Sequence, residues 1–189
     1  MTAKSVLILC GSRRQPSYTA SLASAIAASL VQSGAVVDCL VPDTLPFADA
    51  ETRLERDGHD HPAVAGLFAR AGSADAIVLA SPVYHNSSSG LLKNALDWLG
   101  MREFRGKAVG LASHGGSSPQ PVDHLRIVAR ALQAIAIPTQ VCTAEAHFGP
   151  LDEVTGRFPM IDANIGKRID KFSGELLDFA GMLARRNGA

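Results

Sequence analysis

The sequence predicts an α/β domain built around a doubly wound parallel sheet. Short apolar runs alternate along the chain with segments of helical periodicity, which is the pattern of consecutive βαβ units. Most of these runs are continuously apolar, as expected for strands that are covered on both faces. A length of 189 residues suits one domain of this kind. We therefore expect a single domain over residues 1–189, with helices on both faces of the sheet.

Five apolar runs are expected to form the strands. They lie at residues 5–10, 35–41, 75–81, 107–113 and 137–144. The segments between them have helical spacing, at 17–33, about 62–72, 88–101 and 119–136. A final helix is expected at about 161–186, where a stripe of apolar residues recurs at helical intervals. The polar stretch 42–61 is expected to be a long surface connection.

Charge and composition exclude several classes of protein. Lys+Arg and Asp+Glu number 18 each, so no net field favours nucleic acid or an anionic membrane. No apolar run approaches the roughly 18 residues of a membrane span, and the run at 5–10 is too short for a signal peptide. The three cysteines are far apart and have no paired spacing, which fits a reducing compartment. We expect a cytoplasmic protein without a nucleic-acid or membrane partner.

The first informative motif is GSRRQPSYTASLA at 11–23, where the first strand passes into a helix. Unpaired N–H groups at a helix start bind anions, and serine, threonine and arginine side chains add further donors. The stretch therefore fits a terminal phosphate. It has neither the P-loop pattern nor the dinucleotide pattern G-x-G-x-x-G. The alternative is a serine helix cap beside two surface arginines.

Two more polar loops follow strands that are expected to neighbour the first. SPVYHNSSSGLLKNALDWLG, at 81–100, begins at the carboxyl end of the third strand, and SHGGSS, at 113–118, follows the fourth. Ligands of open α/β sheets bind at the carboxyl ends of the strands. We therefore expect the three loops to form one site.

The motif at 11–23 resembles the GS-x-R-x-x-S-x-N-x-x-LA signature of the NAD(P)H-dependent FMN reductases, which have the flavodoxin-like fold. The stretch 81–99 resembles their [ST]-P-x-Y-x-x-S-x-x-G-x-L-K-N-x-[IL]-D-W-L block. The order and separation of the motifs extend the resemblance over most of residues 4–145. It implies a five-stranded sheet of order 2-1-3-4-5, FMN as cofactor, and NADPH or NADH as co-substrate.

The resemblance also implies roles for particular residues. The FMN phosphate would be held by Ser12, Arg14, Ser17 and Thr19. The ribityl chain and the flavin ring would lie along Pro82, Val83, Tyr84, His85 and Asn86. The ring edge would meet Ser113, His114, Gly115 and Gly116. The sequence departs from the family at Thr19, where asparagine is frequent, and in PVYH, where PEYN is frequent.

The implied reaction is the reduction of bound FMN by NAD(P)H, followed by electron transfer to an acceptor. The acceptor could be a quinone, an azo compound, a metal oxyanion, free flavin or a partner monooxygenase. No catalytic side chain and no metal is expected, because the cofactor carries the chemistry. One alternative is a flavodoxin-like electron carrier without NAD(P)H oxidation of its own. Another is a flavodoxin-like domain that has lost its flavin and only binds a partner.

Three further features of the sequence have more than one interpretation. Leu91 and Trp98 are expected to form an exposed patch that builds a homodimer or a homotetramer; the alternative is that the C-terminal segment covers Trp98. His59 and His61 flank Asp60 in a loop that reads better as solvated than as a metal site. The 2′-phosphate of NADPH has four candidate partners, Arg53, Arg56, Arg102 and Arg105.

Overall fold

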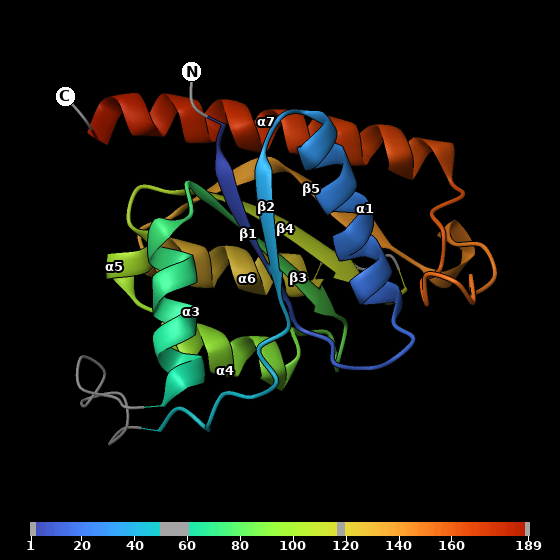
Figure 1. Ribbon diagram of the computed structural model, residues 1–189, viewed down its shortest axis with the longest axis horizontal. Coiled ribbons are helices and arrows are strands. Elements are labelled where there is room, and N and C mark those ends of the chain that lie inside the picture. Colours follow the sequence, from blue (N-terminus) through green and yellow to red (C-terminus); the bar gives the residue numbers. More distant parts are fainter. Residues whose placement is uncertain (1–2, 50–60, 117–119, 188–189) are drawn as a thin grey trace.

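A computed structural model describes residues 3–49, 61–116 and 120–187. Five strands form one parallel sheet in the order β2-β1-β3-β4-β5 (Figure 1). The strands are β1 (Ser5–Cys10), β2 (Val36–Leu40), β3 (Ala76–Pro82), β4 (Ala108–His114) and β5 (Ile135–Thr143). The predicted fold class and strand order are confirmed, and each strand lies within two residues of its predicted range.

Helices cover both faces of the sheet (Figure 1). One face packs against α1 (Tyr18–Gln32) and α7 (Ala163–Asn187). The other face packs against α3 (Pro62–Ser73), α4 (Gly90–Trp98) and α6 (Gln120–Ala131). The predicted helix at 88–101 is divided, because the chain is extended at Leu99 and turns again in the short α5 (Met101–Phe104). The buried carboxylate of Glu103 accepts the Gly100 N–H at 2.9 Å and fixes this break.

Central and edge strands differ in burial. All seven residues of β3 are buried, as the continuous apolar pattern predicts. β2 is an edge strand, and Val36 is 63% exposed, so this run, which contains Asp38, is not covered on both faces. β5 lies at the other edge and shifts register opposite Val109 and Leu111. There the Thr139 N–H donates to the Glu175 carboxylate of α7 at 3.1 Å instead of to a strand.

The loop after β2 is attached to α4. Asn94 donates from Nδ2 to the Pro46 carbonyl at 2.9 Å and accepts the Ala48 N–H at 2.8 Å. Trp98 donates from Nε1 to the same carbonyl of Pro46 at 2.9 Å. Trp98 is only 1% exposed as a result. The predicted exposed Trp98–Leu91 patch is therefore wrong, and so is the alternative cover, because α7 lies on the opposite face of the sheet.

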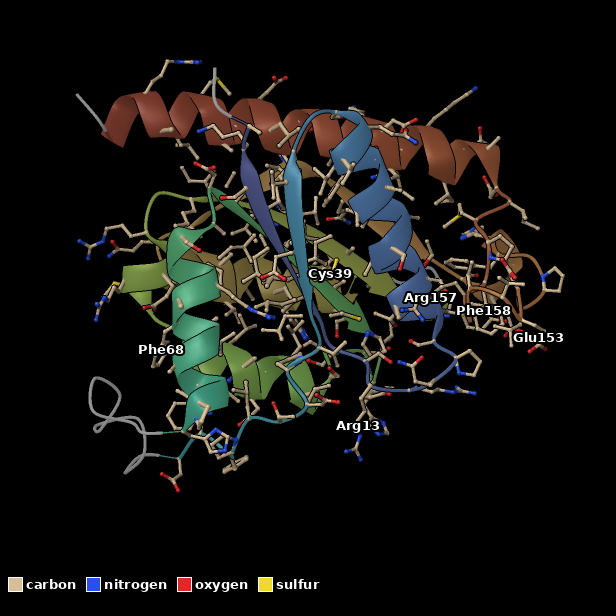
Figure 2. The ribbon with its side chains drawn as sticks, viewed as in Figure 1. Arg13, Cys39, Phe68, Glu153, Arg157 and Phe158 are labelled. Carbon is tan, nitrogen blue, oxygen red and sulfur yellow. The ribbon has the colours of Figure 1, made fainter. Side chains whose placement is uncertain are left out.

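The segment between β5 and α7 was not predicted to be structured. It contains the 3₁₀ turn η2 (Glu145–His147) and isolated bridges that pair Phe148 with Met160 and Asp152 with Arg157. We call residues 144–162 the β5–α7 excursion. Figure 2 shows Arg157 and Phe158 of this excursion beside α1. The Phe158 N–H donates to Ser21 Oγ at 2.9 Å, so the excursion is attached to α1 near its start.

The expectations about the His59–His61 loop and about membrane spans can be compared with the described residues only. His61 caps α3 by accepting the Ala63 N–H at Nδ1, at 3.3 Å, while His59 and Asp60 lie outside the described residues. Within residues 3–49, 61–116 and 120–187, every helix is too short or too polar to cross a membrane.

Candidate functional site

The loops that follow β1 and β3 border a pocket of about 550 Å³. These two strands are neighbours at the place where the order of the sheet reverses, and such a switch point leaves a crevice at the carboxyl ends. The wall of the pocket consists of Gly11, Ser12, Arg13, Arg14, Tyr84, Ser89, Gly90 and Leu91. The structure thus brings together the first two predicted loops.

The floor of this pocket is held by a contact between Gly11 and Ser89. Ser89 donates from Oγ to the Gly11 carbonyl at 2.7 Å and also accepts the Leu92 N–H as the cap of α4. A Cβ at Gly11 would lie 2.6 Å from Ser89 Oγ and 2.8 Å from Leu92 Cβ. Gly11 is therefore required by the close approach of α4 to the turn. The sequence analysis did not identify this contact between Gly11 and Ser89.

Two buried serines organise the start of α1. Ser17 is the N-cap, and its Oγ accepts the Ala20 N–H at 3.2 Å while donating to Ser12 Oγ at 2.9 Å. Since the Ser12 oxygen accepts this bond, its own hydroxyl proton remains able to donate into the pocket. The first N–H groups of α1 have no acceptor within the helix. These donors and the helix dipole together favour an anion at this place.

The four residues predicted to hold a phosphate are not equivalent. Ser12 and Arg14 line the pocket. Ser17 lies one hydrogen bond behind Ser12, and Thr19 is 2% exposed within α1. Among the described residues, neither Arg13 nor Arg14 forms an ion pair with a carboxylate. Within the described part of the chain, the pocket therefore carries two cations without a carboxylate partner and no acidic side chain.

The loop after β3 forms a tight two-residue turn. Tyr84 and Ser87 exchange both backbone hydrogen bonds, at 3.0 and 2.9 Å, and the intervening His85 and Asn86 have φ values of 49° and 60°. Positive φ at both central residues is typical of a type I′ turn. His85 and Asn86 are exposed at its tip, and Tyr84 is 54% exposed. Pro82 is buried at the end of β3, so it can shape the site through the backbone only.

The loop after β4 packs closely on the loop after β3. The Val83 N–H donates to the His114 carbonyl at 2.8 Å, and Gly115 donates to the Thr143 carbonyl at 2.9 Å. Gly115 has a φ of 137°, and a Cβ there would lie 2.8 Å from Val83 Cβ. This position therefore requires glycine for two reasons, its positive φ and its close contact with Val83. Gly116 is exposed with a φ of 74°, and Ser113 is buried in β4.

The His114 side chain turns toward α1 and packs in an aromatic cluster with Tyr18, Phe148 and Phe158. Its ring stacks on Tyr18 with 4.8 Å between centroids, and Tyr18 stacks on Phe158 at 3.9 Å. Thr143 Oγ1 donates to the Ser113 carbonyl, so at 3.1 Å it accepts from Nδ1–H of His114. Burial lowers the pKa of His114, and the charge of Glu145 opposes this change. The imidazole is thus behind the loop and is not part of the pocket wall.

Tyr18 connects this cluster to the arginines. Desolvation and a hydrogen bond with Glu145 raise the pKa of Tyr18, while the charge of Arg14 opposes the rise. Arg14 is therefore near enough to the first residue of α1 to influence it.

The described candidates for the 2′-phosphate lie away from this pocket. Arg102 belongs to α5 and Arg105 follows it, just before β4 begins, so both lie at the amino ends of the strands. This placement is wrong for a contact with a ligand at the carboxyl ends. Arg53 and Arg56 lie outside the described residues. Within the described part of the chain, no three His, Cys, Asp or Glu side chains gather in a group that could hold a metal ion.

A five-stranded parallel sheet of this order, with helices on both faces, defines the flavodoxin-like class. The sequence profile of the NADPH-dependent FMN reductases matches residues 5–148. The chain belongs to this family. The matched region ends within the β5–α7 excursion, so most of the excursion and all of α7 follow it.

Curated relatives include FMN-dependent NADPH-azoreductases of two staphylococci. The protein of Staphylococcus saprophyticus is 41% identical over 115 residues, which are 60% of this chain and 60% of that protein. The protein of Staphylococcus aureus is 38% identical over the same length and the same shares. The matched region therefore spans about three fifths of the length of these relatives.

Solved structures show the same fold at lower identity. An NAD(P)H:(acceptor) oxidoreductase from Paracoccus denitrificans has a TM-score of 0.78 at 18% identity, covering 95% of this chain and 98% of its own. An apo NADH:FMN oxidoreductase has a TM-score of 0.69 at 24% identity, with coverages of 90% and 89%. A flavodoxin from Streptococcus pneumoniae has a TM-score of 0.57 at 15% identity, with coverages of 93% and 99%.

Proposed function

We propose that this protein is an FMN-dependent oxidoreductase that oxidises NADPH or NADH and passes electrons to a small acceptor. The observation that carries the proposal is the donor set at the start of α1, in a pocket whose described lining residues include no acidic side chain. Ser12, Arg14 and the free N–H groups of the helix suit the dianionic phosphate of FMN. Family membership and the azoreductase names of the curated relatives support the same conclusion.

The chain's own residues would bind and orient the cofactor. FMN, when bound, supplies the capacity to accept a hydride and release electrons. Ser12 and Arg14 would hold its phosphate, and the Tyr84–Ser87 turn would lie along its ring. Gly115 and Gly116 would let backbone N–H groups approach the ring edge from the loop after β4. A site of this kind needs no acid or base from the protein.

Flavin identity and turnover test this proposal. Purified protein should retain FMN, identified by chromatography after denaturation, because one phosphate-binding turn suits FMN and not FAD. FMN-loaded protein should oxidise NADPH or NADH when an azo dye, a quinone, a metal oxyanion, free flavin or a partner monooxygenase is the acceptor. Bound FMN without any NAD(P)H oxidation would favour the electron-carrier alternative. Protein that binds no flavin would overturn both.

Assembly and compartment belong to the proposal as well. The loop that covers Trp98 presents Phe47, which is 78% exposed, so a large apolar side chain remains on this side of the molecule. We propose that it supports a homodimer or a homotetramer, and light scattering of the FMN-loaded protein tests this. A monomer with full activity would contradict it.

The three unpaired cysteines fit a reducing cytoplasm.

A further inference from the structure

We propose that Arg13 binds the 2′-phosphate of NADPH and gives this enzyme a preference for NADPH over NADH. The inference rests on the proposed function and assigns separate phosphates to the adjacent arginines. Arg14 would serve the phosphate of FMN, which stays in the protein. Arg13 would serve the phosphate of a co-substrate that enters and leaves.

The first support is an excess of positive charge over what FMN needs. Both arginines line the pocket, and neither is neutralised by a carboxylate among the described residues. A single phosphate at the start of α1 is already served by Ser12, by the helix N–H groups and by one guanidinium. A second exposed guanidinium in the same wall is therefore available for another anion.

The second support is the different direction of the two side chains. Arg14 influences Tyr18, the first residue of α1, which places it on the side of the helix start. Figure 2 shows Arg13 projecting from the loop after β1, away from the body of the sheet. Arg13 is thus on the rim of the pocket, between the bound-cofactor position and solvent.

The third support comes from the chemistry of the two nicotinamide nucleotides. NADPH and NADH have the same reactive ring and differ only in the phosphate on the adenosine ribose. A residue that distinguishes them must therefore contact the end of the molecule that is remote from hydride transfer. A cation on the rim of the pocket suits this requirement. Arg102 and Arg105, at the amino ends of the strands, do not.

The test compares Arg13→Ala with Arg14→Ala in FMN-loaded protein. Arg13→Ala should raise KM for NADPH by about tenfold or more, the range for losing a charge-assisted hydrogen bond, and leave KM for NADH nearly unchanged. It should also weaken binding of 2′,5′-ADP, measured by calorimetry, without weakening binding of 5′-AMP. The FMN dissociation constant should increase in Arg14→Ala and stay close to wild type in Arg13→Ala. Arg105→Ala is the matched control for loss of a surface arginine.

Each result decides the inference separately from the proposed function. Equal KM changes for NADPH and NADH in Arg13→Ala would overturn the assignment while leaving an FMN oxidoreductase intact. So would loss of FMN in Arg13→Ala, because that would place the residue on the cofactor phosphate. A wild-type protein that holds FMN but oxidises neither nucleotide would defeat the proposed function itself. In that case 2′,5′-ADP binding still reports on Arg13 alone.

Discussion

Gly110 of β4 lies directly under the ring of Phe172 in α7. A Cβ at residue 110 would be 2.3 Å from Phe172 Cζ, and both residues are in the buried layer between α7 and the sheet. The missing side chain of Gly110 is therefore the space that the phenyl ring fills. This fit sets how closely the C-terminal helix approaches the central strands.

Gly110→Ala should destabilise the protein by about 1–3 kcal/mol, the usual effect of overpacking a well-filled core. Gly174→Ala is the matched control in α7, because a Cβ there meets nothing within 4 Å. That variant should be more stable than wild type by about 0.5–1 kcal/mol, since alanine favours the helix. Urea unfolding of both variants checks the pair. Equal effects of the two substitutions would contradict the contact.

Substitutions at Ser12 and Ser17 should affect FMN binding and the stability of the protein to different extents. Ser17→Ala removes the cap of α1 and should cost about 1 kcal/mol of stability, whereas Ser17→Gly should cost only a few tenths. Ser12→Ala leaves the cap in place but removes the hydroxyl donor that faces the pocket. It should weaken FMN binding by about tenfold and also cost about 1 kcal/mol of stability, because the buried Ser17 hydroxyl loses its acceptor. Fluorescence titration and thermal unfolding give the two readouts, and an unchanged FMN affinity in Ser12→Ala would be the contrary result.

Ser173→Ala should stabilise the protein. Ser173 is fully buried in α7, and its Oγ has no hydrogen-bond partner among the residues that the structure describes. An unpaired buried hydroxyl carries a desolvation penalty of about 1 kcal/mol or more, and alanine also favours the helix. The melting temperature should therefore rise. A decrease would mean that the hydroxyl has a partner that the geometry does not show.

His114 should make stability depend on pH near neutrality. Burial lowers its pKa below the ordinary value of 6.5, so the unfolded chain takes up a proton more readily than the folded protein. Stability should therefore be greatest above about pH 7 and fall as the pH drops through 6.5 toward the lower pKa of the folded state. His114→Gln should flatten this part of the profile, measured by urea unfolding between pH 8 and 5. An unchanged slope would show that other groups cause it.

The strands of the sheet could be predicted from the sequence because each is marked by a local run of apolar residues. Continuous apolar runs located β1, β3 and β4, whose residues are buried almost throughout. The edge position of β2 did not follow from its composition, because an edge position is decided by which strands pair. The β5–α7 excursion has no periodicity, and it is positioned by contacts such as the stacking of Phe158 on Tyr18. Such contacts join residues far apart in the chain and leave no local signal.

The site was predictable in its backbone and less so in its side chains. The positions of the three loops follow from strand order, and three of the candidate residues, Ser12, Arg14 and Tyr84, line the pocket. The direction of the His114 ring depends on Thr143 and Tyr18, which belong to other elements. Trp98 was misjudged because helical periodicity gives the face of a residue but not the loop that covers it.

The attachment of the β2 loop to α4 has an evolutionary consequence. Asn94 and Trp98 bind this loop through the carbonyl of residue 46 and the N–H of residue 48. Main-chain atoms are the same whatever side chain the residue carries, provided that residue 48 is not proline. Phe47, which points outward between these two points, can therefore be exchanged without loosening the anchorage. Mutations can thus change the exposed side chains of this loop while its backbone path is conserved.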